Sequence, residues 1–178
     1  MKNTQKISLL LLVLSILGAC KSEKKEEVKE ITVDKTEVIE QKSKGKLEFS
    51  KSDMLVIFND YLKIKNAFVA SDATAVKKTA GEAAASLSGE HKELKELLES
   101  MTSADDLESQ RALFEELSVK LEPQLEKNIA SGTIYKQYCP MAFNNKGSFW
   151  FSDKEQIANP YFGNMMLRCG SVTAKISK

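Results

Sequence analysis

The sequence contains few of the residues on which metal-rich and disulfide-rich proteins depend. Its 178 residues include one histidine, three cysteines and three prolines. A single histidine excludes a conventional histidine-rich zinc site, and three cysteines are too few for a disulfide-dense small protein. Neither charge is in excess, because 26 Lys and Arg residues stand against 25 Asp and Glu residues. This balance removes the general electrostatic argument for nucleic-acid binding.

The residue patterns typical of enzymes are also missing. No Ser-His-Asp or Cys-His spacing supports nucleophilic catalysis, and no glycine-rich phosphate loop is present. Carboxylates are plentiful, but they are scattered over expected helix surfaces, so no general acid–base pair stands out. We therefore expect a protein that is not an enzyme.

Residues 1–19 have the order of features found in a bacterial lipoprotein signal peptide. Lys2 and Lys6 precede an apolar run over residues 7–17, which is shorter than the roughly 20 residues that span a bilayer. Leu17-Gly18-Ala19-Cys20 resembles a lipobox, which implies cleavage before Cys20 and lipid on its thiol. We expect anchoring in the bacterial cell envelope, on the outer membrane facing the periplasm, because Lys21 and not aspartate follows the cysteine. The alternatives are an uncleaved anchor helix or an ordinary signal peptide with a chance cysteine.

The rest of the chain divides into a tether and one folded domain. Residues 20–49 are dominated by Lys, Glu, Ser and Thr, and such a segment cannot bury enough apolar surface to offset its ordering entropy. We expect a flexible, lipid-anchored charged tether there. Residues 50–178 have the length of a single domain.

Apolar residues spaced three and four apart predict four amphipathic helices, over about 50–69, 72–87, 90–101 and 106–131. The [ST]-x-x-[DE] spacing of a helix N-cap occurs at Ser50 to Asp53 and again at Ser103 to Asp106, and Ser71-Asp72 starts the second helix. Pro123 should kink the last helix, and Ser131-Gly132 should end it. Four such helices with short connections predict an up-and-down bundle.

The C-terminal fifth is rich in β-branched and aromatic residues. Three short strands are expected over 133–138, 148–151 and 172–176, with a turn at 144–147 between the first two. The predicted fold class is therefore mainly α, a four-helix up-and-down bundle with a small C-terminal β-ribbon or sheet (α+β).

Sulfur is concentrated in the last 40 residues. Thiolates and thioethers are soft donors that suit Cu(I). Cys139 and Met141 are two apart, so on a strand they point to the same side. Met165 and Met166 lie four and three positions before Cys169, so on a helical turn either could converge with it. If the two segments meet, a site with two cysteines and a methionine is geometrically reasonable.

Each of these residues also has a structural interpretation. Cys139 and Cys169 could form a disulfide, which would stabilise the fold by roughly 3–4 kcal/mol, or remain as buried thiols. The methionines could simply fill the core. His91, the lone histidine, is most often a surface or capping residue in such a position, and it could supply a fourth ligand only if its helix end faced the C-terminal segment. Trp150, Tyr161 and Phe162 could line a ligand surface or pack in the core.

Four segments together resemble an uncharacterised bacterial domain: residues 61–72, 111–118, 138–142 and 159–170. That domain occurs as small exported proteins and lipoproteins, and it is fused to periplasmic adaptor subunits of copper/silver-type heavy-metal efflux pumps. The resemblance covers about residues 52–176. It implies copper or silver handling, with Cys139, Met141, Met166 and Cys169 as metal ligands and Met165 as a substitute.

Two functions follow as expectations. The first is a lipid-anchored periplasmic protein that binds Cu(I) or Ag(I) and sequesters the ion or delivers it to heavy-metal efflux components. The chain lacks the hairpin and barrel portions of an adaptor, so it is not an adaptor by itself. The alternative is a structural or protein-interaction lipoprotein of the envelope, in which Cys139 and Cys169 form a disulfide. In that case the aromatic segment around Trp150 and residues 159–162 would dock a partner.

Overall fold

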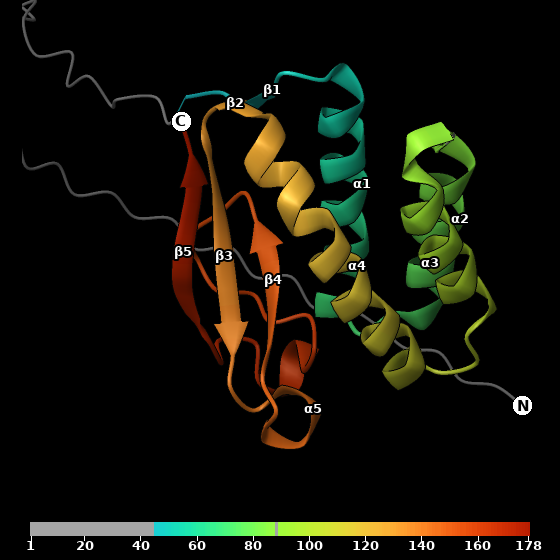
Figure 1. The fold of residues 1–178 in the computed structure, drawn as a ribbon. Coiled ribbons are helices and arrows are strands. Elements are labelled where there is room, and N and C mark those ends of the chain that lie inside the picture. The colour runs from blue at the N-terminus through green and yellow to red at the C-terminus, as the bar shows by residue number, and fades with distance from the viewer. Residues whose placement is uncertain (1–44, 88) are drawn as a thin grey trace, which may run out of the picture. The chain divides into compact units, whose positions relative to one another are not determined.

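A computed structural model describes residues 45–87 and 89–178 (Figure 1). The expected signal peptide, Cys20 and all but the last five residues of the expected tether lie outside this part of the chain. Within it, no helix is both long enough and apolar enough to cross a membrane.

Four long helices occupy the first two thirds of the described residues. They are α1 (Ser52–Val69), α2 (Ala73–Ser86), α3 (Lys92–Ser103) and α4 (Leu107–Asn128), with a short 3-10 helix, η1 (Gly89–His91), before α3. Helices begin after Ser71-Asp72 and after Ser103 to Asp106 as expected, and the carboxylates of Asp72 and Asp106 accept hydrogen bonds from backbone N–H groups three residues ahead, at 2.9 and 2.8 Å. The cap of α4 is thus Asp106 and not Ser103, which is the last residue of α3. The cap expected at Ser50 is wrong: α1 begins after Lys51 with no side-chain cap.

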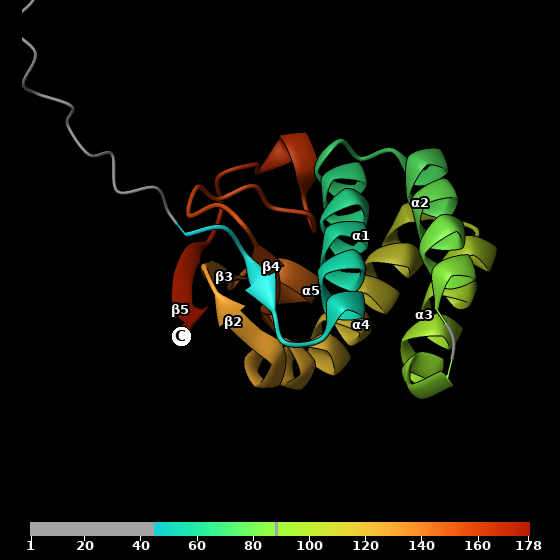
Figure 2. The ribbon, with the colours of Figure 1, turned by 90° about the horizontal axis from the view of Figure 1, so that it is seen from above.

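The helices and the sheet form layers. Helices α1 and α4 lie between the sheet and the pair α2 and α3, in both the front view (Figure 1) and the view from above (Figure 2). Consecutive helices contact each other, and α4 also contacts β4. A mainly helical α+β architecture is therefore confirmed. A regular up-and-down bundle stays a prediction.

The C-terminal segment forms a three-stranded antiparallel sheet. Strand β3 (Thr133–Cys139) is central, between β4 (Ser148–Ser152) and β5 (Ser171–Ser177). All three expected strands are thus confirmed. A second, two-stranded sheet pairs β1 (Glu48–Phe49) with β2 (Ile129–Ser131), so α4 ends at Asn128 and not at Ser131 as expected. The strands β1 and β2 are too short to leave a periodic signal in the sequence.

Two short elements connect the strands at the lower end of Figure 1. The expected turn at 144–147 is a wider excursion that contains the one-turn helix α5 (Ala142–Asn145). Three of its residues, Phe143, Asn144 and Asn145, have positive φ angles. A second 3-10 helix, η2 (Gly163–Met165), lies in the long segment between β4 and β5.

A buried tyrosine joins the middle helices, α1 and α4, to the sheet. The hydroxyl of Tyr61 on α1 lies 2.7 Å from the Ser118 hydroxyl on α4 and accepts a hydrogen bond from the Phe151 N–H on β4 at 3.1 Å. Burial raises the pKa of the Tyr61 phenol, so it stays protonated. One buried side chain therefore fixes α1, α4 and the sheet relative to one another.

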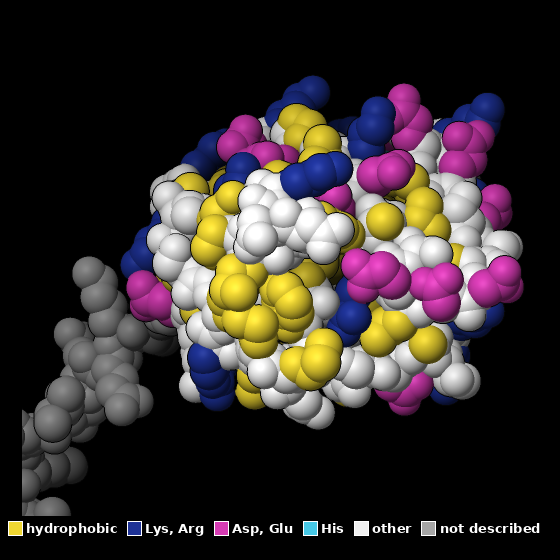
Figure 3. All heavy atoms as spheres, turned by 90° about the horizontal axis from the view of Figure 1, so that it is seen from below, with side chains coloured by type: hydrophobic (Ala, Val, Ile, Leu, Met, Phe, Trp, Pro, Cys, Tyr) yellow, Lys and Arg dark blue, Asp and Glu magenta, His cyan; other side chains and the backbone are white. Residues whose placement is uncertain are grey.

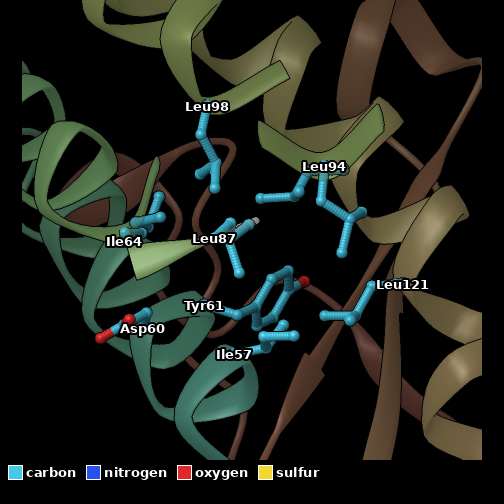
Figure 4. A pocket seen from close by; sticks show the side chains of 10 residues that line it. Ile57, Asp60, Tyr61, Ile64, Leu87, Leu94, Leu98 and Leu121 are labelled. Carbon is cyan, nitrogen blue, oxygen red and sulfur yellow. The ribbon is translucent and has the colours of Figure 1, made fainter. Parts of the chain in front are cut away.

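A small, partly open hollow of about 20 Å³ lies between the helical layers (Figure 4). Its labelled lining consists of Asp60, Tyr61 and the apolar residues Ile57, Ile64, Leu87, Leu94, Leu98 and Leu121. A hollow of this size holds about one water molecule, and its mainly apolar walls offer such a water few partners. It is therefore a packing defect and not a ligand site.

Candidate functional site

Two of the expected ligand residues meet at the lower end of the sheet. The Sγ atoms of Cys139 and Cys169 lie 3.3 Å apart, and both residues are free thiols. Cys139 is fully buried and Cys169 is half-buried. The two segments therefore fold together as expected, and the pair lies where solvent reaches one of its sulfurs.

The register of the sheet explains this pairing. Tyr138 on β3 lies opposite Ser171 on β5, so the next residue, Cys139, lies beside Gly170 and its neighbour Cys169. Gly170 has a φ angle of +134°, and a Cβ atom there would lie 2.8 Å from the Tyr138 carbonyl oxygen. Only glycine therefore lets the Cys169 segment approach β3 this closely.

Buried amides hold the segment between β4 and β5 against the sheet. The Asn159 Nδ2 donates to the Cys169 carbonyl at 2.8 Å, and its Oδ1 accepts from the Tyr161 N–H at 2.8 Å. The Gln137 Nε2 donates to the carbonyls of Lys154 and Glu155, at 2.9 and 3.1 Å. Cys169 is therefore positioned by the tertiary structure, and not only by its neighbours in sequence.

The contact between the two sulfurs changes the acidity of the accessible one. The hydrogen bond to Cys139, together with burial, raises the pKa of the Cys169 thiol above its ordinary value. The thiol form therefore predominates at neutral pH. The stabilisation that this protonated contact gives the fold is present below the ordinary thiol pKa and is lost as the pH rises through the raised value.

We expect Cys169 to react with iodoacetamide at pH 8 more slowly than an unperturbed thiol, because the thiolate is the reactive form. Its rate should reach half-maximum at a higher pH, measured by peptide mass spectrometry so that Cys20 is counted separately. A Cys139→Ala change removes the sulfur contact and should move the midpoint down. A wild-type midpoint at or below the ordinary thiol pKa would contradict the described contact.

Two of the expected methionine ligands, Met141 and Met165, lie at the surface of the domain. Met141 and Met165 are 44% and 79% exposed, and they are two of the four exposed large hydrophobic side chains in the described part. Both line an open recess with Arg111, Phe143 and Phe162, a recess that neither cysteine lines. Hydrophobic side chains gather on this face of the domain (Figure 3). Core filling is thus wrong for Met141 and Met165.

The backbone around each methionine differs from the one expected. Strand β3 ends at Cys139, and Met141 has helical φ and ψ angles of −90° and −10°. The expectation that Cys139 and Met141 point to the same side of one strand is therefore wrong. Met165 lies in η2, and the half-buried Met166 follows it, with its carbonyl accepting from the Cys169 N–H at 3.0 Å. The thiol pair and the methionine recess are two neighbouring features formed by the same two segments.

The aromatic residues of this region belong mainly to the core. Trp150 is fully buried on β4, and Tyr161 is buried with its hydroxyl donating to the Phe149 carbonyl at 2.7 Å. Asn159 is also fully buried. Trp150 and Asn159 are therefore not available to dock a partner, whereas Tyr161 and Phe162 both line the recess.

One further cluster was not identified as a site from sequence. The Nε2 of His91 lies 2.9 Å from the Asp53 carboxylate and 3.8 Å from the Glu90 carboxylate. His91 is the N-cap residue of α3, but its ring makes no capping hydrogen bond, and the expected surface location is wrong because the ring is buried. Glu90-His91 adjacency was visible in the sequence, but the contribution of Asp53, from 38 positions away, was not.

Of the comparisons with known proteins, the one with protein-family models gave a match, and it covers the helical part of the chain. No match was found among curated proteins or among solved structures. The family match ends before β3, so it includes His91 but neither cysteine of the thiol pair. Residues 57–132 match the model of a family described as "Protein of unknown function (DUF3347)", an uncharacterised domain family.

Proposed function

We propose that this protein binds a soft metal ion, Cu(I) or Ag(I), through the thiols of Cys139 and Cys169, and that it sequesters the ion or delivers it to an acceptor. The observation that carries the proposal is the 3.3 Å separation of the two sulfurs. Two thiolates held side by side are the ligand set that such ions prefer. Half-burial of Cys169 gives the ion a route to a sulfur that is otherwise enclosed.

Binding requires a small opening of the pair. With metal–sulfur bonds of about 2.3 Å, two sulfurs lie about 3.8 Å apart at a tetrahedral angle and about 4.6 Å apart in a linear arrangement. The pair must therefore widen by roughly 0.5 to 1.3 Å. Cys139 is fixed at the end of the central strand, so the adjustment falls on Cys169 and the segment that precedes β5.

The reaction is an exchange of protons for metal. Two thiols and one Cu(I) ion give a bis-thiolate complex and two released protons, and no electron is transferred. Because contact with Cys139 raises the pKa of Cys169, proton release opposes binding at low pH. The proposed affinity therefore increases with pH until both thiols are ionised.

The methionine recess supports a role in transfer. Met141 and Met165 place thioether sulfurs in solvent, and each lies within four residues of a cysteine of the pair. Thioethers bind Cu(I) without losing a proton, so they suit first capture of the ion. The proposed lipid anchor at Cys20 and the charged tether would hold the domain at the envelope membrane, near heavy-metal efflux components.

The test is a Cu(I) titration of the full chain carrying Cys20→Ser, under anaerobic conditions, in competition with a chromophoric Cu(I) chelator. We expect one tightly bound ion per chain. Adding Cys139→Ser and Cys169→Ser should weaken the affinity at least about tenfold, or 1.4 kcal/mol. Unchanged affinity in that variant would refute the proposal.

A matched variant tests the division of roles. Met141→Leu with Met165→Leu leaves the thiols in place, and we expect it to slow metal uptake more than it weakens the final affinity. If the leucine variant abolished binding while the serine variant retained it, the ion would belong to the recess and not to the thiol pair.

The separation of the two sulfurs also supports the alternative function, in which Cys139 and Cys169 form a disulfide. Sulfurs 3.3 Å apart need to approach by about 1.3 Å to form a disulfide, with loss of two protons and two electrons to an oxidant. The protein would then be a structural or interaction lipoprotein of the envelope. Intact mass after alkylation without reductant distinguishes the two, because permanent loss of both thiols favours the disulfide.

A further inference from the structure

A second group of metal-ligating side chains lies apart from the thiol pair, where α1 begins and η1 leads into α3. It consists of Asp53, Glu90 and His91, and one donor atom from each lies within 4.8 Å of the others. His91 is the only histidine of the chain and is 7% exposed. In the described structure, Nε2 of His91 contacts both carboxylates. The other ring nitrogen, Nδ1, is buried and has no hydrogen-bond partner there. The ring is therefore aimed into the cluster.

The separations in this cluster suit a small divalent cation. With bonds of about 2.1 Å to imidazole nitrogen and carboxylate oxygen, two ligands at a tetrahedral angle lie about 3.4 Å apart. The Nε2 distances of 2.9 Å to Asp53 and 3.8 Å to Glu90 lie on either side of that value. The imidazole is fixed by burial, whereas both carboxylates are exposed and can adjust.

We infer that Asp53, Glu90 and His91 form a binding site for a divalent cation of the Zn²⁺ class, separate from the soft-metal site at the thiols. Nε2 of His91 and one oxygen of each carboxylate are the protein ligands, and water fills the remaining position. A site with three protein ligands and an open position is typical of exchangeable or reactive zinc. One nitrogen and two oxygens select against Cu(I), which prefers sulfur.

One carboxylate of this cluster already forms an ion pair with a lysine. Lys51 Nζ lies 2.9 Å from both oxygens of Glu90 and neutralises the carboxylate that the cation requires. The pKa of Glu90 is lowered by Lys51 and that of Asp53 by its hydrogen bond to His91, so both carboxylates are ionised at neutral pH. Cation and lysine therefore compete for Glu90, and removal of Lys51 should tighten cation binding.

The experiment is a Zn²⁺ titration of the full chain in which Cys20, Cys139 and Cys169 are serine, so that no thiolate contributes. We expect one Zn²⁺ ion per chain, and a shift of the ¹⁵N resonance of the single histidine at Nε2 on binding. His91→Ala and Asp53→Asn should each weaken binding about tenfold or more. Lys51→Gln should strengthen it, an effect that a merely structural ion pair would not produce.

The controls separate this site from general surface charge and from misfolding. Glu93→Gln removes an exposed carboxylate that pairs with Lys120 at 2.8 Å on the adjacent helix, and it should leave the affinity unchanged. Asp53→Asn alters an exposed side chain, so it reports on the site even if His91→Ala unfolds the domain. No Zn²⁺ binding by the thiol-free chain, or equal affinity in the Asp53 and Glu93 variants, would overturn the inference. Neither result bears on Cu(I) binding by the thiols.

Discussion

Replacing Phe114 with alanine is expected to lower the free energy of unfolding by about 3–5 kcal/mol, because it removes a large aromatic side chain from the centre of the core. Phe114 lies fully buried on α4, and its ring centre is 4.9 Å from that of Tyr61 and 5.0 Å from that of Phe68, both on α1. It also lies 6.1 Å from the ring of Tyr161, in the segment that carries Cys169. Its removal opens a cavity among all three.

Urea unfolding of the full chain, followed by circular dichroism, measures this loss. Val119→Ala on the same helix is the matched control, because Val119 is exposed and its truncation should change stability by less than about 0.5 kcal/mol. A loss below about 1 kcal/mol for Phe114→Ala would mean that α4 does not pack on α1 as described.

Asn159→Ala is expected to lower the free energy of unfolding by about 2–4 kcal/mol. Asn159 is fully buried, and its amide joins the Cys169 carbonyl to the Tyr161 N–H. Alanine would leave both backbone groups without a partner, and each buried unpaired group costs about 1–3 kcal/mol. The segment before β5 should also loosen, so Cys169 should be alkylated faster than in the wild-type chain.

The control for this prediction is Asn164→Ala, which removes an exposed amide from the same segment and should leave stability and alkylation unchanged. If Asn159→Ala destabilised the chain without affecting Cys169, the amide would support the fold but not the thiol pair. Equal, small effects of both variants would contradict the described hydrogen bonds.

The two proposed metal sites differ in how the fold presents them. The thiol pair is formed by strand register and one glycine, at the end of the sheet where β3 stops. The cluster of Asp53, Glu90 and His91 is formed by the helix starts and holds harder donors. One domain could therefore bind two classes of cation without competition, and the Cu(I) and Zn²⁺ titrations examine the two sites separately.

The helices and strands could be predicted well from the sequence, because both depend on local periodicity. Apolar spacing identified four helices, and side-chain caps at Asp72 and Asp106 fixed where two of them begin. The cap expected at Ser50 failed because its hydroxyl bonds to Asn128 across the fold instead. Residue spacing predicts that a side chain could cap a nearby helix, but it does not reveal a competing hydrogen-bond partner that is distant in sequence.

By itself the sequence determined that the chain is mainly helical with a small C-terminal sheet. It also placed the candidate sulfur ligands in two segments of the C-terminal part. Only the tertiary structure decided that Cys139 meets Cys169 while Met141 and Met165 line a separate recess, and that Asp53 reaches His91. Local periodicity sets the type of each element, because it depends on neighbours a few residues away. Which side chains share a point in space depends on register, turns and buried hydrogen bonds between residues 30 or more positions apart.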